Sequence, residues 1–140
     1  MTKLQQAKTQ LATGKYTCVL CADETICTTT RRGVKPLVLW LEQGGVPRGF
    51  CAADKVVGKA TAFLYCLLGA KAVYADVMSR SAKTVLETHG IQTQCAILTD
   101  YIENRTKTGI CPFEEAVLGI EEPEQARLAI HKKMRELGIS

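Results

Sequence analysis

The chain has 140 residues, enough to bury the core of one globular domain. Hydrophobic residues make up 46% of it and charged residues 23%, a balance that argues against intrinsic disorder. The net charge is +4, but the basic residues are dispersed along the chain and form no run. Aromatic residues make up only 6%, so the sequence does not indicate a nucleic-acid-binding surface.

The sequence carries no signal for a membrane. No apolar stretch reaches the roughly 20 residues that cross a bilayer, and the N-terminus has no apolar signal-peptide core. We therefore expect a cytoplasmic protein without membrane contacts. The seven cysteines are an odd number, which favours reduced thiols, and no cofactor or metal is expected.

The first part of the chain predicts a helix, a hairpin and a second helix. Apolar spacing over residues 2–13 is helical. Residues 16–21 and 25–30 are β-prone and are separated by a short polar loop, which predicts an antiparallel hairpin. Residues 37–43 then predict a helix with Pro36 in its first turn.

The central stretch predicts a buried strand that leads into a helix. Residues 50–53 are apolar, and Asp54 is a plausible N-cap for a helix over residues 55–68. Lys55 and Lys59 would share one face of that helix because they are four residues apart. A helix start carries free N–H groups and partial positive charge, so this junction suits an anion.

The rest of the chain continues the alternation of strands and helices. The expected elements are a strand over 72–78, a helix capped by Ser79 or Ser81, a strand over 91–97, a short helix from Pro112 and a helix over 123–138. This order predicts an α/β fold: a three-layer α/β/α sandwich with a mixed sheet of about five strands. We expect a single domain over residues 1–140, with its core in residues 15–118.

The order of elements resembles the cytidine-deaminase-like fold. Those enzymes carry a His-x-Glu or Cys-x-Glu signature where a strand meets a helix, and a Pro-Cys-x-x-Cys signature at the next helix. Residues 52–54 of this chain fall on the first signature and residues 78–82 on the second. The chain is still more similar to an uncharacterised bacterial family with this fold, on three blocks: residues 33–37, residues 53–60, and Asn104-Arg105 together with residues 108–114.

The resemblance implies a deaminase-like fold whose zinc ligands are lost. A catalytic zinc needs three protein ligands and an open position. Ala52, Ser79 and Ala82 stand at the ligand positions, and none of them is a normal zinc ligand. Only Asp54 remains, at the acid/base position.

The expected site lies where the strands end and the helices begin. Its catalytic candidates are Asp54, Lys55 and Cys111, the last because a cysteine beside a helix start is favoured as a thiolate. The ligand-binding candidates are polar or charged residues at the same junctions: Lys35, Lys55, Lys59, Ser79, Arg80, Ser81, Asn104, Arg105 and Glu114.

Three functions fit these residues. The leading one is the binding of a small anionic or nucleotide-like ligand near Asp54, with or without chemistry on it. The alternatives are a catalytically inert interaction or regulatory module, and a thiol-based enzyme that uses Cys111. A homo-oligomer is compatible with the sequence.

Overall fold

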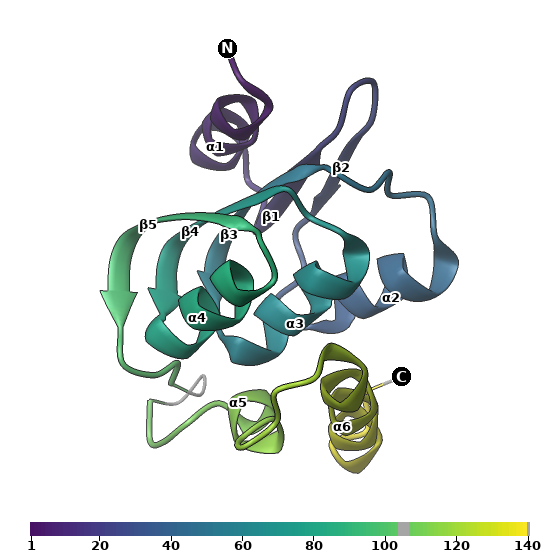
Figure 1. Cartoon of the computed structure of the whole chain (residues 1–140), viewed down its shortest axis with the longest axis vertical. Helices are drawn as coiled ribbons and strands as arrows, with labels where there is room; N and C mark the ends of the chain where they lie inside the picture. The colour runs from purple at the N-terminus through teal and green to yellow at the C-terminus, as the bar shows by residue number, and fades with distance from the viewer. Residues whose placement is uncertain (104–106, 140) are drawn as a thin grey trace.

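The order of helices and strands in the computed structural model follows the sequence prediction (Figure 1). The structure describes residues 1–103 and 107–139, so the predicted site residues Asn104 and Arg105 lie outside the described part of the chain. The elements are α1 (Lys3–Thr13), β1 (Cys18–Cys21), β2 (Ile26–Thr29), α2 (Lys35–Gln43), β3 (Cys51–Val57), α3 (Lys59–Leu68), β4 (Ala72–Ser79), α4 (Arg80–Thr88), β5 (Gln92–Thr99), α5 (Pro112–Ala116) and α6 (Pro123–Glu136).

The strands form one mixed sheet in the order β2-β1-β3-β4-β5. Strand β1 is antiparallel to both β2 and β3, whereas β3, β4 and β5 run parallel. The difference follows from the connections, because a short loop can join only antiparallel neighbours and parallel strands need a crossover such as α3 or α4. The predicted five-stranded mixed sheet is confirmed.

Helices lie on both faces of the sheet (Figure 1). On one face, Ala7 and Leu11 of α1 pack against Val19 and Ala53 of the sheet. Helices α2, α3 and α4 cover the other face, and α6 packs against α3 on the outside. No helix in the described residues has both the length and the apolar character that a bilayer crossing requires.

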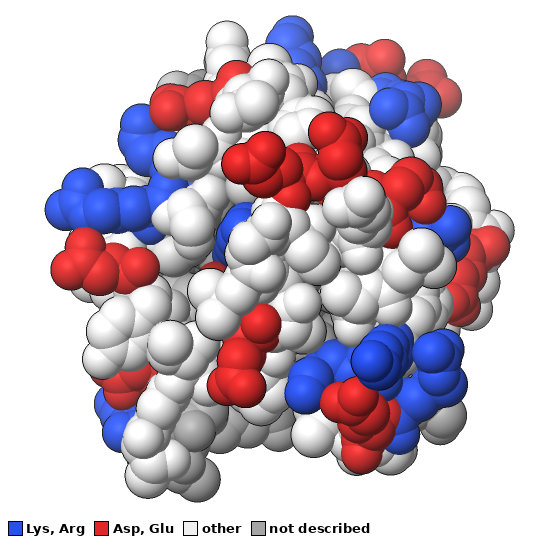
Figure 2. Space-filling view, turned by 60° about the horizontal axis from the view of Figure 1, so that its bottom comes forward, with Lys and Arg blue, Asp and Glu red and all other residues white. Residues whose placement is uncertain are grey.

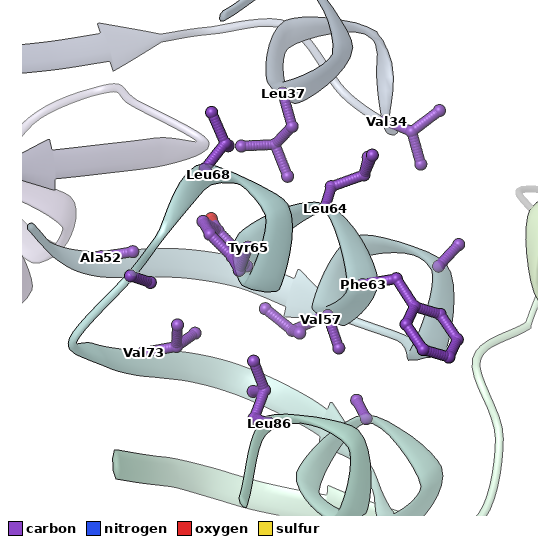
Figure 3. Close-up of a cluster of buried hydrophobic side chains, with 14 of the residues drawn as sticks. Val34, Leu37, Ala52, Val57, Phe63, Leu64, Tyr65, Leu68, Val73 and Leu86 are labelled. Carbon is purple, nitrogen blue, oxygen red and sulfur yellow. The ribbon is translucent and has the colours of Figure 1, made fainter. Parts of the chain in front are cut away.

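The main core lies between the sheet and α3, which is buried along most of its length. Figure 3 shows Phe63, Leu64, Tyr65 and Leu68 of this helix among the surrounding buried side chains. Each fully buried side chain of this size contributes roughly 1.5–3 kcal/mol through the removal of its apolar surface from water. The only hydroxyl among these four belongs to Tyr65, and its bonding partners define the site described below.

The predicted helix start at Asp54 was wrong. Strand β3 continues to Val57, and α3 begins at Lys59 with Gly58 as its N-cap. The strand is longer because its parallel ladder with β4 extends to the pair Val57 and Met78. This ladder outweighs the local capping tendency of Asp54, so Lys55 and Lys59 do not share a helix face.

Candidate functional site

Strand pairing brings Cys18 of β1 next to Asp54 of β3. The two residues are direct partners in the antiparallel ladder. The neighbouring Lys55 N–H donates to the carbonyl of Thr17 at 3.0 Å, which marks that pair as hydrogen-bonded. Cys18 and Asp54 are therefore a non-hydrogen-bonded pair, the arrangement in which opposite side chains approach most closely.

Tyr65 of α3 joins this pair from the other side. Its hydroxyl donates to Asp54 Oδ2 at 2.7 Å, and Cys18 Sγ lies 3.1 Å from the same hydroxyl oxygen. With Asp54 ionised, the Tyr65 proton points to the carboxylate, so the thiol is the donor to Tyr65. We call Cys18, Asp54 and Tyr65 the Asp54 cluster. In this cluster the thiol of Cys18 donates to the hydroxyl of Tyr65, and that hydroxyl donates to one carboxylate oxygen of Asp54.

Burial is the main cause of the raised pKa values in the Asp54 cluster. Loss of hydration raises the pKa of Asp54 to about 6, although hydrogen bonds from Tyr65 and from the backbone N–H groups of Val56 and Lys55 oppose the rise. Burial, and then the Asp54 charge, raise the pKa of the Cys18 thiol and of the Tyr65 hydroxyl well above their usual values. Asp54 is thus the member that changes its protonation state near neutral pH.

The Asp54 cluster borders a cavity of about 820 Å³. The walls come from β1, β3, the loop before α2, the start of α3, the α5 region and the C-terminal residues after α6. The polar or charged residues that border it are Thr17, Cys18, Thr29, Arg31, Arg32, Asp54, Lys55, Thr61, Glu103, Cys111 and Glu114. Apolar side chains such as Leu37 and Phe113 form much of the remaining wall.

Glu114 connects α5 to the beginning of α3. Its carboxylate accepts hydrogen bonds from the backbone N–H groups of Lys59 at 2.7 Å and Ala60 at 2.9 Å. These two groups have no partner within the helix, and the negative charge suits the helix N-terminus. The capping role that the sequence assigned to Asp54 therefore belongs to Glu114, 60 positions further along the chain.

Positive charge reaches the cavity from the loop before α2. Arg31 and Arg32 both border the cavity, and within the described part of the chain neither makes an ion pair with a carboxylate. Figure 2 turns the α5 and α6 side of the molecule forward and shows acidic and basic side chains intermixed on a mostly uncharged surface. No single sign of charge covers that face.

The three predicted lysines occupy different places. Lys35 begins α2 and borders a smaller hollow that shares Arg32 and Phe113 with the main cavity. Lys55 borders the main cavity, but its ammonium lies 3.6 Å from the carboxylate of Asp76. Lys59 does not border the cavity, and its ammonium lies over the ring of Phe63.

The turn at Ser79, Arg80 and Ser81 does not reach the cavity. Ser79 is buried and caps α4, where its hydroxyl accepts from the Ala82 N–H at 3.1 Å and lies 3.2 Å from the Ser81 hydroxyl. Arg80 forms an exposed ion pair with Asp100. The sequence placed this turn in one expected site with Asp54, but the turn does not border the cavity that Asp54 borders.

The residues that the sequence resemblance placed at zinc-ligand positions have structural roles. Ala52 and Ala82 are fully buried in the main core, and Ser79 is used as the helix cap. Across residues 1–103 and 107–139, no three His, Cys, Asp or Glu side chains gather closely enough to hold a metal ion.

Cys111 lies at the position that the sequence predicted. It is the N-cap residue of α5, with Pro112 in the first helical position, and it borders the same cavity as Asp54. Its backbone N–H donates to the carbonyl of Ile102 at 2.9 Å, which ties the start of α5 to the segment after β5.

Sequence reasoning missed two members of the Asp54 cluster. Cys18 falls in a predicted strand and Tyr65 in the predicted helix over residues 55–68, and the sequence pattern assigns neither residue to the candidate site. One signal was available, because a buried tyrosine hydroxyl needs a hydrogen-bond partner. The identity of that partner depends on the β1–β3 pairing and on how α3 packs, which local sequence does not reveal.

These features define an α/β protein with a mixed sheet and a cavity beside a half-buried carboxylate. A family model described as "TM1506: Domain of unknown function (DUF1893)" matches residues 6–134. The chain belongs to this DUF1893 family, so the predicted membership of an uncharacterised family is confirmed.

One similar solved structure comes from the same family. It is the crystal structure of a DUF1893 family protein (TM1506) from Thermotoga maritima, with 21% sequence identity and a TM-score of 0.85. The match covers 95% of this chain and 91% of that chain. At this identity the likeness shows a shared fold. No curated protein matches the chain.

Proposed function

We propose that this chain binds a small organic anion of nucleotide-like size in the cavity beside Asp54. One observation carries the proposal: two arginines that make no ion pair within the described residues and a half-buried carboxylic acid border a single, largely apolar cavity. Its volume of about 820 Å³ falls in the range typical of small-molecule sites.

The cavity offers different chemistry to different parts of a ligand. Arg31 and Arg32 can bind a phosphate or carboxylate group through charge-assisted hydrogen bonds. The Phe113 side of the wall suits an apolar or heteroaromatic ring. Asp54 can accept a hydrogen bond when ionised and donate one when protonated, and its pKa of about 6 makes both forms accessible.

The sequence resemblance to cytidine-deaminase-like enzymes supports a nucleotide-like ligand. In that resemblance Asp54 takes the acid/base position, and Asp54 borders the cavity. Alanine at two of the three zinc-ligand positions cannot coordinate a metal, so we infer that any chemistry here uses Asp54 rather than a zinc-bound water.

A thiol-based enzyme is the second candidate, because Cys111 borders the same cavity. In that case the ligand would be an electrophile within reach of the thiol. An inert interaction module is the remaining alternative, and it requires that the cavity bind no small molecule.

Native mass spectrometry of protein purified without chelator is the first experiment. We expect a retained anionic metabolite, or binding from a panel of nucleoside monophosphates and sugar phosphates in calorimetric titrations. A bare chain that binds no member of the panel would favour the inert module. One zinc ion per chain would contradict the metal-free proposal.

Matched variants then locate the site. Replacing Arg32→Ala removes a charge-assisted hydrogen bond worth roughly 1.5–3 kcal/mol, so we expect affinity to fall about tenfold or more. Arg80→Ala removes the same kind of side chain from an exposed ion pair outside the cavity, and it should leave affinity unchanged. Equal losses in both variants would mean that binding depends on overall charge and not on this cavity.

A further inference from the structure

Strand β5 forms one edge of the sheet and is unusually open. It pairs with β4 alone among the described strands, and Figure 1 shows no element beyond its outer edge. Its eight residues, Gln92–Thr99, contain no charge, no glycine and no proline. All eight are exposed or only partly buried. Such an edge presents unpaired backbone donors and acceptors, and natural proteins usually protect it.

The opposite edge of the sheet has that protection. Strand β2 has only four residues, Ile26–Thr29. Charged residues stand close on both sides of it, with Asp23 and Glu24 before the strand and Arg31 and Arg32 after it. Short length and flanking charge are two of the usual ways in which an edge is kept from pairing. The two edges of one sheet therefore differ in the features that control pairing.

The backbone of β5 is oriented to pair outward. The Gln92 N–H donates to the carbonyl of Lys71 at 3.1 Å, on the inner side of the strand. Because the backbone groups of successive residues in a strand point to opposite sides, those of Thr93 and Cys95 point toward the open edge. Their N–H and C=O groups can form hydrogen bonds with those of an identical strand that runs in the opposite direction.

We propose that two copies of this chain associate through β5, which pairs antiparallel with β5 of the partner to form one continuous sheet. A twofold axis perpendicular to the sheet near Cys95 satisfies both strands at once, because it places the same outward groups of each copy opposite one another. A second copy is the occupant that this edge favours, since an uncharged strand is complementary to itself and offers nothing to select a charged peptide.

An apolar row reaches the edge at the same place. Val56, Val77 and Ile97 are aligned across β3, β4 and β5. Ile97 is 59% exposed and Val56 is 44% exposed. In the paired sheet, the Ile97 side chain of each copy lies opposite Thr93 of the other copy and becomes less exposed. Backbone pairing and apolar burial thus act on the same surface.

The oligomeric mass of matched edge variants tests this proposal. We expect wild-type protein to have twice the 15.3 kDa chain mass in size-exclusion chromatography with light scattering. Ile97→Lys replaces an apolar side chain of the pairing edge with a charge in each copy and should give the mass of one chain. Ile26→Lys makes the same change at a 45% exposed isoleucine of the β2 edge, and it should leave the dimer intact.

Amide hydrogen exchange provides a readout that does not depend on any variant. The outward N–H groups of Thr93 and Cys95 should be protected in wild-type protein and should exchange faster on dilution to monomer. A wild-type chain that is monomeric up to its solubility limit would overturn the proposal. A dimer that persists in Ile97→Lys with the native fold, or rapid exchange at Thr93 and Cys95 in the dimer, would also overturn it.

Discussion

The Glu114 carboxylate occupies the space next to Gly58 that any larger residue would need. A Cβ at position 58 would lie 2.7 Å or less from three atoms of the Glu114 carboxyl group. This contact joins two blocks that the sequence marks separately, residues 53–60 and residues 108–114. It also fixes α5, and with it one wall of the cavity, against the beginning of α3.

Replacing Gly58→Ala should therefore displace Glu114. We expect a loss of about 1–2 kcal/mol in the free energy of unfolding, the size of a lost helix cap, measured by urea denaturation. The Glu114→Ala background is the control. With the carboxylate absent, the added methyl group has room, so the two losses should not add. Fully additive losses would show that Gly58 and Glu114 act independently.

The charge of Glu114 should matter as well as its shape. Glu114→Gln keeps an oxygen acceptor but removes the negative charge from the α3 N-terminus, so we expect a smaller loss of about 0.5–1 kcal/mol. The same change at the exposed neighbour Glu115 should be close to neutral in the same urea denaturation. Equal effects at both positions would point to net charge and not to the cap.

Asp54 should make stability depend on pH in an unusual direction. Its pKa rises from 3.8 to about 6 on folding, so the folded state favours the protonated acid. The resulting stabilisation is complete below the unfolded pKa and is lost as pH rises through about 6. At 1.36 kcal/mol for each pKa unit, this loss is roughly 3 kcal/mol.

The variant Asp54→Asn isolates this effect. Asparagine cannot ionise but can still accept from Tyr65, so its stability relative to wild type should increase by up to roughly 3 kcal/mol between about pH 4 and pH 7. Urea unfolding across that range measures the difference. The control Asp100→Asn, at an 83% exposed side chain, should not reproduce it. A constant difference between Asp54→Asn and wild type would contradict the raised pKa.

Tyr65 should hold the pKa of Asp54 below the value that burial alone would impose. Tyr65→Phe removes the 2.7 Å hydrogen bond to the carboxylate, so the pKa of Asp54 should rise further above 6. Carbon-13 NMR titration of the aspartate carboxyl groups measures this change. Tyr74→Phe removes a similar bond to Asp76, and it should leave Asp54 unaffected.

Alkylation at neutral pH should separate the cysteines by exposure and ionisation. Cys18, Cys21 and Cys51 are buried and should react slowest. Cys111 is partly exposed and should react before Cys66, because burial raises the pKa of the Cys66 thiol to about 11. Mass spectrometry of peptides gives the rates. If Cys111 reacts no faster than the other six thiols, its role as a nucleophile is excluded.

Local pattern was enough to predict most of the elements and the class of fold. The hairpin, the strands that alternate with helices and the short helix at Pro112 all follow from hydrophobic period and turn residues over short stretches. The same information placed Asp54, Cys111 and Glu114 in the candidate site, and all three border one cavity. Local pattern predicted the wrong start for α3. Asp54 has the residue type of a helix cap, but the pairing of β3 with β4, which extends the strand past Asp54, depends on residues far away in the sequence.

The tertiary structure decided which side chains act together. Glu114 caps a helix that begins 55 residues before it, and the Asp54 cluster needs β1, β3 and α3 in contact. Ser79 and Arg80 carry the residue types of a ligand site, yet packing directs one to a helix cap and the other to an ion pair. Sequence by itself determined the periodic elements, because each depends on neighbours a few residues away. The site depends on contacts between distant segments, and these form only when burial and strand pairing bring the segments together.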